Sequence, residues 1–482
     1  MKSPKKLNEL LHGFATADAR PIAALASDSR AVTAETLWLA ARGVTHHALD
    51  YYRDGLQAAA IVYEPPYANP PAGAIACEHL SEHLGSIAAR FYDHPAKALN
   101  VIGVTGTDGK SSLVHFLAQA TGGAMLGTIG YGKLDALEPA SHTTPDPLRV
   151  QQYLARFRDA GIETVAMEVS SHALAQGRVA AVEYHIGVFT NLSRDHLDYH
   201  HDMEDYFLAK ASLFARPLPV AVINIDDAHG RRLLDENRVH PKTRVIAVSS
   251  QNHAHPRAAL TLRARDIVLS PDGIAYTLET EAEQVAIQSG LLARFNVDNL
   301  LNTAACLLAL GTPFAAIPAK LAALHGVPGR AERIGLGNGA AAIIDYAHTP
   351  AALANILQGV RAHVPGKLWC VFGCGGDRDR GKRPLMAQAA EQYADAVVIT
   401  DDNPRTENPA DIIADSLRGM GHREKAWIKR PREEAIRFVL PQLEAGDAVV
   451  IAGKGHEDYQ ILGTTKHHYS DQETVRTWLQ NR

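Results

Sequence analysis

Apolar runs of strand length alternate with stretches of helical spacing along much of the chain. We expect strands at 100–106, 163–172, 185–193, 219–227 and 243–250. Strands that alternate with helices are typical of a mostly parallel sheet that helices cover on both faces. The pattern therefore predicts a central α/β domain built on such a sheet.

The pattern changes at residues 262–281, where apolar and polar positions alternate on both sides of a Pro-Asp-Gly turn. Alternation around such a turn predicts an antiparallel hairpin. Stretches of helical spacing follow at 291–310 and 313–327. We therefore expect an antiparallel flap and then helices before the next group of strands.

The pattern predicts a further domain at each end of the chain. Residues 1–97 hold short mixed elements and a Pro-rich stretch, which predicts a small α/β domain. Beyond 328–333, strands and helices alternate again, as in a doubly wound, Rossmann-like domain. A chain of 482 residues exceeds what a single core usually supports. The predicted domains are 1–97, 98–328 and 329–482.

Composition narrows the classes of function. A net charge of −5 provides no overall basic field for nucleic acid or an anionic membrane. The chain starts without an apolar core of signal-peptide length and has no run of 18 apolar residues, so we expect a cytoplasmic protein without membrane insertion. Its four scattered cysteines suit a reducing compartment. The close pair Cys370 and Cys374 reads as small buried side chains rather than metal ligands.

A candidate phosphate-binding loop, GTDGKSS (106–112), follows the first expected strand. The usual pattern would place an earlier Gly at position 104, where this chain has Val104. The physical requirements are nevertheless met, because a strand delivers the loop, glycines let N–H groups converge, a helix follows and Lys110 can neutralise phosphate. Ser111 is placed to bind Mg²⁺. The alternative is a surface turn with an incidental lysine.

This variant loop resembles that of the Mur ligases and of their relatives that make folylpolyglutamate, which reads G-T-N-G-K-[TS] without the earlier Gly. Asp108 departs from the family, where Asn is usual. The resemblance extends over nearly the whole chain, through AMEVSSHALAQGRV (166–179), FTNLSRDHLDYHHDMEDYFLAKASLF (189–214), RFNVDNLLNTAA (294–305), PGRAER (328–333), DYAHTPAAL (345–353), GCGGDRDRGKRPLM (373–386), TDDNPRTENP (400–409) and AGKGHEDYQ (452–460).

The resemblance implies an N-terminal domain for the UDP part of a substrate, a central phosphate-loop ATPase domain and a C-terminal domain for an incoming amino acid. It also implies an ATP-dependent amide-bond ligase that works through an acyl phosphate. Its substrates would be UDP-N-acetylmuramoyl-L-alanyl-D-glutamate and meso-diaminopimelate, in cytoplasmic peptidoglycan synthesis, which serves cell-wall biogenesis, cell shape and cell division. We expect a monomer with no nucleic-acid partner.

The resemblance assigns catalysis to Lys110, Glu168, His196 and Lys210. Of these, Glu168, His196 and Lys210 would bind Mg²⁺ together with Ser111, and Lys210 would do so as a carbamate formed with CO₂. Considered alone, Glu168 could be an N-cap or a salt-bridge partner, and Lys210 could form an ordinary helical pair near Glu204. The implied ATP-binding residues are Gly106, Thr107, Asp108, Gly109, Lys110, Ser111, Ser112, Asn299, Arg330 and His348; Asn299 could equally cap a helix.

The substrate sites also follow from the resemblance. Arg405 of the DNPR segment could bind the distal carboxylate of diaminopimelate bidentately, and Glu457 could face its distal ammonium. The implied diaminopimelate-binding residues are Arg378, Asp402, Asn403, Pro404, Arg405, Gly453 and Glu457. The implied UDP-substrate residues are Ser27, Ser29, Thr45, His46, Thr143, Thr144, Ser170, Gln176 and Arg178.

Other functions remain as alternatives. A lysine-adding relative is disfavoured by the DNPR segment, and a folylpolyglutamate-type ligase by DNPR together with EVSSHALAQGRV. A non-catalytic nucleotide-binding regulator is disfavoured because Lys110, Glu168, His196 and Lys210 are all present. A helicase is disfavoured because no stripe of Arg and Lys with interleaved aromatics occurs.

Overall fold

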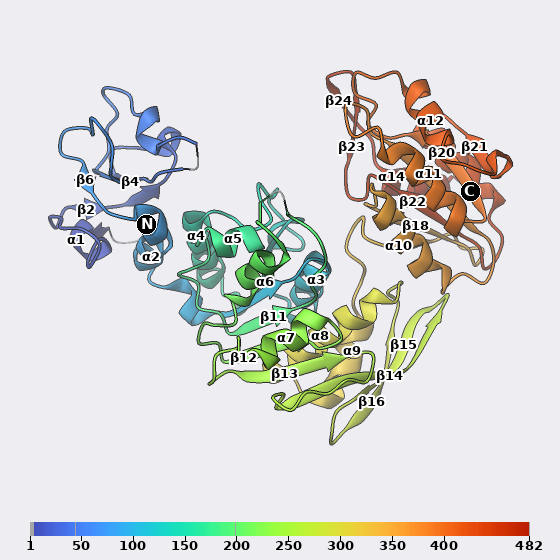
Figure 1. The fold of residues 1–482 in the computed structure, drawn as a ribbon, viewed down its shortest axis with the longest axis horizontal. Helices are drawn as coiled ribbons and strands as arrows, with labels where there is room; N and C mark the ends of the chain where they lie inside the picture. Colours follow the sequence, from blue (N-terminus) through green and yellow to red (C-terminus); the bar gives the residue numbers. More distant parts are fainter. Residues whose placement is uncertain (1–3, 44, 198, 482) are drawn as a thin grey trace. The chain divides into compact units, whose positions relative to one another are not determined.

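The computed structural model describes residues 4–43, 45–197 and 199–481. Figure 1 labels its helices and strands. The chain divides into two compact units. Unit 1 comprises Met1–Ser249, His253–Thr261 and Ala305–Thr312, and unit 2 comprises Ser250–Asn252, Leu262–Ala304 and Pro313–Arg482. The finer division into three domains stays a prediction.

The N-terminal part of unit 1 is a small α/β structure, as expected. Its sheet has the order β3-β4-β5-β6, all parallel, and all five residues of the central strand β4 are buried. A short antiparallel pair, β1-β2, lies beside it in the chain. The elements are β1 (Lys5–Lys6), α1 (Leu7–Leu10), β2 (Pro21–Ile22), β3 (Ala24–Ala26), η1 (Ser29–Ala31), β4 (Thr36–Ala40), η2 (Ala48–Tyr51), β5 (Ala60–Tyr63), β6 (Ile75–Ala76), α2 (Leu80–Phe91) and η3 (Pro95–Ala98).

The rest of unit 1 is built on the predicted parallel sheet. Within it the strand order is β13-β12-β11-β7-β10-β8-β9, and only the edge pair β8-β9 is antiparallel. Its elements are β7 (Asn100–Thr105), α3 (Lys110–Thr121), β8 (Ala124–Gly127), β9 (Gly130–Lys133), α4 (Pro147–Asp159), β10 (Thr164–Glu168), α5 (Ser171–Ala175), β11 (Ile186–Phe189), α6 (Met203–Ala211), β12 (Val220–Asn224), α7 (Ala228–Asp235) and β13 (Arg244–Ser249). Each of the strands expected here is confirmed.

The expected flap is also confirmed, as the antiparallel strands β14 (Leu260–Ser270), β15 (Gly273–Glu279) and β16 (Gln284–Ser289). Ser270 pairs with Gly273, so two residues close the turn between β14 and β15. Gly273 has φ 123°, and a side chain there would collide with the carbonyl of Ser289. The helices that follow are α8 (Phe295–Ala309) and α9 (Ile317–Ala322), with the short η4 (Phe314–Ala316) between them.

The C-terminal part of unit 2 is doubly wound, as predicted. Its sheet has the order β17-β18-β22-β19-β20-β21, and only β17 is antiparallel. One face packs against α10, α11 and α12, and the other against α13 and α14. The elements are β17 (Glu332–Gly335), β18 (Ala341–Asp345), α10 (Pro350–Arg361), β19 (Leu368–Cys374), α11 (Lys382–Tyr393), β20 (Ala396–Asp401), α12 (Pro409–Leu417), η5 (Arg423–Lys425), β21 (Ala426–Ile428), α13 (Arg432–Val439), η6 (Leu440–Gln442), β22 (Ala448–Ala452), β23 (Tyr459–Leu462), β24 (Thr465–His468) and α14 (Asp471–Gln480).

The cysteines belong to the interior of the protein. All four cysteines are free and buried, Cys370 and Cys374 among them, which confirms their interpretation as small core side chains. Within the described part of the chain, none of the helices has the length and apolar character that crossing a membrane requires.

A buried ion pair joins α13 to α14. Arg432 and Asp471 both have fully buried side chains, and the guanidinium donates to both carboxylate oxygens at 2.8 Å. It also donates to the carbonyl of Ala452 at the end of β22 (2.9 Å). The pair therefore ties two helices to the strand that leads into the 453–457 loop.

Replacing Asp471 should destabilise this unit, because Asp471→Asn leaves the Arg432 charge buried without a carboxylate. We expect a loss of about 3–5 kcal/mol in the free energy of unfolding. Urea titration followed by circular dichroism would measure it. The control is Glu433→Gln, which breaks the solvent-exposed pair of Glu433 with Arg437 and should cost less than about 1 kcal/mol. Equal stabilities of the two variants would contradict a special role for the buried pair.

Candidate active site

The loop between β7 and α3 has the conformation that its glycines permit. Gly106 has φ 151°, and a side chain there would collide with the hydroxyl of Thr190. Gly109 has φ 83° and precedes α3, which begins at Lys110. The Lys110 ammonium donates to the carbonyls of Gly106 (2.9 Å) and Thr107 (2.7 Å). The loop thus holds the lysine at the N-terminus of a helix, where an anion is favoured.

The glycine one position before Val104 has a packing role instead. A Cβ on Gly103 would lie 2.6 Å from the ring of Tyr184, so only glycine leaves room for that ring. Val104 is itself a fully buried strand residue. The departure from the usual phosphate-loop pattern is therefore compatible with a complete loop that begins at Gly106.

Asp108 turns toward the segment after β11. Its backbone N–H donates to Asn191 Oδ1 (2.9 Å), and its carbonyl accepts from the Thr190 hydroxyl (2.7 Å). Its carboxylate accepts from the Ser193 hydroxyl at 3.4 Å and is exposed. The extra negative charge therefore lies at the solvent-facing side of the loop. Thr107 meets the same segment, accepting a hydrogen bond from the Ser193 N–H (3.0 Å).

Lys210 reaches the same loop from α6. Its side chain is 1% exposed, and its ammonium donates to the carbonyl of Gly106 at 2.7 Å. It also lies 4.5 Å from the centre of the Tyr206 ring. Burial, together with the nearby Lys110 charge, lowers the pKa of Lys210 well below its usual value, and Asp195 and Asp108 act in the opposite direction. A larger share of neutral amine follows.

The alternative interpretation of Lys210 as an ordinary surface pair is wrong. Glu204 of the same helix pairs instead with Arg232, at 2.6 Å. Lys210 faces inward because the helix turns its other side, with Glu204 and Leu208, toward solvent. The acidic residues close to it in the sequence are therefore not its partners.

Glu168 and His196 follow the strands on either side of β7. Glu168 ends β10, is 1% exposed, and accepts a hydrogen bond from the Thr128 N–H at 2.8 Å. His196 follows β11, with its ring Nε2 3.5 Å from an Asp195 oxygen and its ring centre 5.0 Å from that of His172. Since β10, β7 and β11 are parallel neighbours, all these residues lie at one edge of the sheet.

The donor set at this edge suits a hard cation. Mg²⁺ is usually held by one or two carboxylates together with water and substrate phosphates. Glu168 offers a carboxylate, and Ser111, in the first turn of α3 beside Ser112, offers a hydroxyl. Among residues 4–43, 45–197 and 199–481, no group of three or more His, Cys, Asp or Glu is arranged to hold a metal by itself.

Polar residues predicted for the UDP substrate gather beside Glu168. The Thr144 hydroxyl donates to the Glu168 carbonyl (2.8 Å), and the Ser170 N–H donates to the Thr144 hydroxyl (3.1 Å). Arg178 donates to the Thr144 carbonyl (3.1 Å) and to the Gln176 amide oxygen (2.8 Å). Thr143 accepts from the Thr128 hydroxyl at 3.2 Å. The residues brought together are Thr143, Thr144, Ser170, Gln176 and Arg178.

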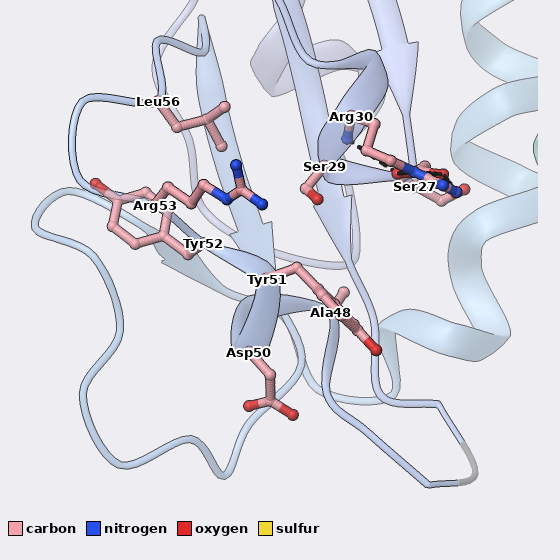
Figure 2. Close-up of a pocket in the computed structure, with 10 residues that line it drawn as sticks. Ser27, Ser29, Arg30, Ala48, Asp50, Tyr51, Tyr52, Arg53 and Leu56 are labelled. Carbon is pink, nitrogen blue, oxygen red and sulfur yellow. Dashed lines mark hydrogen bonds and ion pairs between the residues drawn. The ribbon is translucent and has the colours of Figure 1, made fainter.

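A cavity of about 840 Å³ opens in the N-terminal part of unit 1 (Figure 2). The predicted Ser27 and Ser29 line it. Thr45 and His46 are exposed just before η2, and the His46 ring lies 6.4 Å from that of Tyr51, which does line the cavity. Much of the wall was not predicted from the sequence, although aromatic residues beside an arginine could have indicated it: Asp50, Tyr51, Tyr52, Arg53 and Leu56.

A polar cluster in unit 2, referred to below as the candidate amino-acid pocket, unites two segments predicted to bind an amino acid. Asp402 and Asn403 follow β20, and Glu457 follows β22. The Asn403 amide donates to Glu457 Oε2 at 3.2 Å. Gly453, with φ 119°, brings the backbone close to Asp402, since a Cβ there would lie 3.5 Å from Oδ2. Between these groups lies Lys454, which the sequence analysis did not single out.

Arg405 packs against a glycine turn. It donates to the carbonyl of Gly376 (2.8 Å). A Cβ on Gly375 would lie 3.0 Å from the Arg405 guanidinium and 3.7 Å from Cγ of the exposed Arg378. A side chain on Gly376 would collide with the carbonyl of Pro404, so the turn and the DNPR segment are closely packed. The turn thus holds the Arg405 guanidinium beside Asn403.

The remaining residues predicted for ATP belong to unit 2. The Arg330 guanidinium lies 5.1 Å from the centre of the Tyr346 ring, and His348 Nδ1 is 2.8 Å from the Tyr346 carbonyl oxygen. Asn299 is 5% exposed and donates to Asn296 Oδ1 at 2.9 Å. It is the fifth residue of α8, so its alternative interpretation as a helix cap is wrong.

Comparisons with known proteins agree with this architecture. Family models match residues 104–307, as the Mur ligase middle domain, and residues 329–455, as the Mur ligase, glutamate ligase domain. A UDP-N-acetylmuramoyl-L-alanyl-D-glutamate--2,6-diaminopimelate ligase of Alkalilimnicola ehrlichii is 45% identical over 480 residues, 95% of each chain. One of the same name from Pseudomonas aeruginosa is 46% identical over 467 residues, 94% of each chain.

A solved structure of a protein with that name is also similar. It is 34% identical, with a TM-score of 0.76, and the alignment covers 99% of both chains. The phosphate loop, the sheet edge and the C-terminal pocket described above all fall inside these matches. Because the similarity to relatives at 45% identity extends over 95% of its length, the chain belongs to the Mur ligase family.

Proposed function

We propose that this protein is an ATP-dependent ligase that adds meso-diaminopimelate to the D-glutamate of UDP-N-acetylmuramoyl-L-alanyl-D-glutamate. The observation that carries the proposal is the pair of ammonium groups, Lys110 and Lys210, that meet at the carbonyl of Gly106 in the phosphate loop. Relatives of that name at 45% identity support the choice of substrates. The reaction would belong to cytoplasmic peptidoglycan precursor synthesis.

Each predicted domain would bind one substrate. Residues 1–97 would hold the UDP part, 98–328 would hold ATP, and 329–482 would hold the amino acid. The Ser27 and Ser29 cavity supports the first assignment, since it is large enough for a nucleotide and its wall is polar and aromatic. We expect the protein to act as a monomer, without nucleic acid.

The chemistry begins with activation of the glutamate carboxylate. That carboxylate attacks the γ-phosphoryl group of ATP, the bond to ADP breaks, and an acyl phosphate forms. The amine of diaminopimelate then attacks the acyl carbon, and phosphate leaves from a tetrahedral intermediate. The first step brings two anions together, so the Lys110 ammonium at the helix N-terminus would screen their repulsion. Bound Mg²⁺ would supply further positive charge at the phosphates, held through Ser111, Glu168 and His196.

Lys210 would carry a carbamate in the active enzyme. Only a neutral amine attacks CO₂, and the attack releases a proton as the N–C bond forms. Burial beside Lys110 favours the neutral amine of Lys210. The product is a carboxylate-like group on a long side chain, which would offer oxygen donors to a second Mg²⁺ at the same loop.

The incoming amino acid would bind in the pocket of unit 2. The Arg405 guanidinium lies beside Gly375, where it could donate to a distal carboxylate. The exposed Arg378 would reach the same carboxylate from the neighbouring turn. Asp402 and Glu457 would face the distal ammonium. Lysine lacks the second carboxylate and would leave the arginines without an acceptor, which penalises it.

The direct test measures ADP release with the UDP-dipeptide precursor and ATP, using diaminopimelate and lysine in parallel. We expect release to require both the precursor and the amino acid. We also expect diaminopimelate to be preferred in kcat/KM by at least about a hundredfold, because lysine lacks the carboxylate that Arg405 would bind. Preference for lysine would identify a lysine-adding relative, and release without an amino acid would point to a nucleotide-binding regulator.

Removal of the Lys210 amine should nearly abolish synthesis. Lys210→Ala should lower kcat by at least about a thousandfold, a loss of about 4 kcal/mol of transition-state stabilisation. Added acetate should restore part of the activity by replacing the carbamate. Lys242→Ala, which removes an exposed lysine of the same unit, is the matched control and should be unaffected. Full activity of Lys210→Ala would contradict the assignment.

Arg405→Ala should weaken use of diaminopimelate far more than use of ATP. Loss of a charge-assisted pair predicts a rise of about a hundredfold in KM for diaminopimelate, with KM for ATP within about twofold of the wild-type value. Arg423→Ala, at an exposed position of the same unit, serves as the control. Steady-state kinetics with each substrate varied in turn would measure both constants, and equal effects on the two would refute the role of Arg405.

A further inference from the structure

A buried lysine joins the two segments that form the amino-acid pocket. The side chain of Lys454 is fully buried, and its ammonium lies 3.4 Å from Asp402 Oδ1 and 3.3 Å from Glu457 Oε2. It also donates to Asn403 Oδ1 at 3.2 Å. A single cation therefore contacts residues from the loop after β20 and from the loop after β22. None of the steps proposed above uses it.

The backbone around Lys454 is held in one conformation. Gly453 and Gly455, on either side, have φ 119° and 53°. A Cβ on Gly455 would lie 2.6 Å from that of Tyr346, so the turn is packed against its neighbours. On its other side, Arg432 donates to the carbonyl of Ala452 (2.9 Å). The ammonium is thus delivered to the pocket by a rigid turn.

A buried ammonium is costly unless carboxylates pair with it. Lys454 in turn stabilises the two carboxylates, because Asp402 and Glu457 would repel each other without a cation between them. Lys454 offsets one of these two negative charges. The charge of Arg432, on the other side of the turn, is neutralised by Asp471.

A cation at this position distinguishes the two candidate amino acids. At neutral pH diaminopimelate carries two carboxylates and two ammonium groups, whereas lysine has one carboxylate fewer and a net charge of +1. A fixed cation beside the substrate disfavours the more cationic amino acid. Removing that cation would lessen the repulsion of lysine.

We propose that Lys454 is a positioning and specificity-determining residue. Its ammonium orients Asp402, Asn403 and Glu457 toward the substrate and adds a fixed positive charge beside it, so that an amino acid with a second carboxylate is selected over one without it. This inference rests on the proposed function, because it assumes that the pocket takes an amino acid of this class.

The test is the ratio of kcat/KM for lysine to kcat/KM for diaminopimelate, measured on one preparation of each variant. The ratio does not depend on the folded fraction, which affects both substrates equally. Lys454→Met removes the charge and keeps most of the side-chain volume. We expect the ratio to rise about tenfold, because one unit of charge is removed close to the substrate. KM for ATP should stay within about twofold of the wild-type value, which a general loss of structure would not predict.

A double variant separates charge from packing. Glu457→Gln removes one negative charge and should lower the ratio, while Lys454→Met combined with Glu457→Gln should return it close to the wild-type value. If Lys454→Met alone does not fold, the double variant compared with Glu457→Gln carries the same test, since a neutral glutamine needs no ammonium partner. A tenfold difference between those two is then expected.

Lys466→Met is the matched control. Lys466 is exposed on β24 and lies 3.9 Å from the centre of the Tyr459 ring, whose centre is 5.6 Å from the Lys454 ammonium. The same substitution there should leave the ratio unchanged. The proposal is overturned if Lys454→Met keeps the wild-type ratio or if Lys466→Met shifts it equally. Failure of the wild-type enzyme to use diaminopimelate would instead refute the proposed function, a distinct result.

Discussion

Two ammonium groups converge on one backbone carbonyl, and much of the candidate active site depends on how that arrangement is held. Lys110 and Lys210 both donate to Gly106. Burial and the neighbouring Lys110 charge lower the pKa of Lys210, while Asp195 and Asp108 act in the opposite direction. A larger share of neutral amine follows, which is the form that the proposed carbamate requires.

The arrangement requires a rigid frame, which the parallel sheet provides. Glu168 ends β10, the phosphate loop follows β7, and Thr190 and Asn191 follow β11, so neighbouring strands deliver their groups to one edge. Hydrogen bonds between the loop and the segment after β11 then fix the position of Gly106. Unit 2 uses the same device, since the two sides of its pocket follow β20 and β22, each of which pairs with β19.

Buried charges organise both units, but with different consequences. In unit 1, Lys210 has a backbone carbonyl and an aromatic ring as close partners, and its pKa falls. In unit 2, Lys454 lies between two carboxylates and Arg432 is paired with Asp471. A lysine without a carboxylate partner can become reactive, whereas a paired one acts as a fixed charge that shapes the site around it.

Much of the fold could be predicted because it is encoded locally. The parallel strands of both sheets follow from apolar runs between stretches of helical spacing, and the flap follows from alternation of apolar and polar positions. The phosphate loop follows from glycines and a lysine between a strand and a helix. Side-chain direction could not be predicted in this way. The acidic residues near Lys210 suggested a solvated helix face, yet Glu204 pairs with Arg232 and Lys210 turns inward. Likewise, the sequence did not predict that residues 51–53 line the N-terminal cavity.

The sequence by itself determined the order of the elements, the phosphate loop and the resemblance to one family, because each depends on neighbouring residues and their periodicity. Only the tertiary structure decided which charges meet. Gly103 leaves room for the ring of Tyr184, and Asp108 faces Ser193. Lys454 links two loops. Those contacts join residues far apart in the chain, and their energies depend on burial and distance, which become defined only when the chain folds.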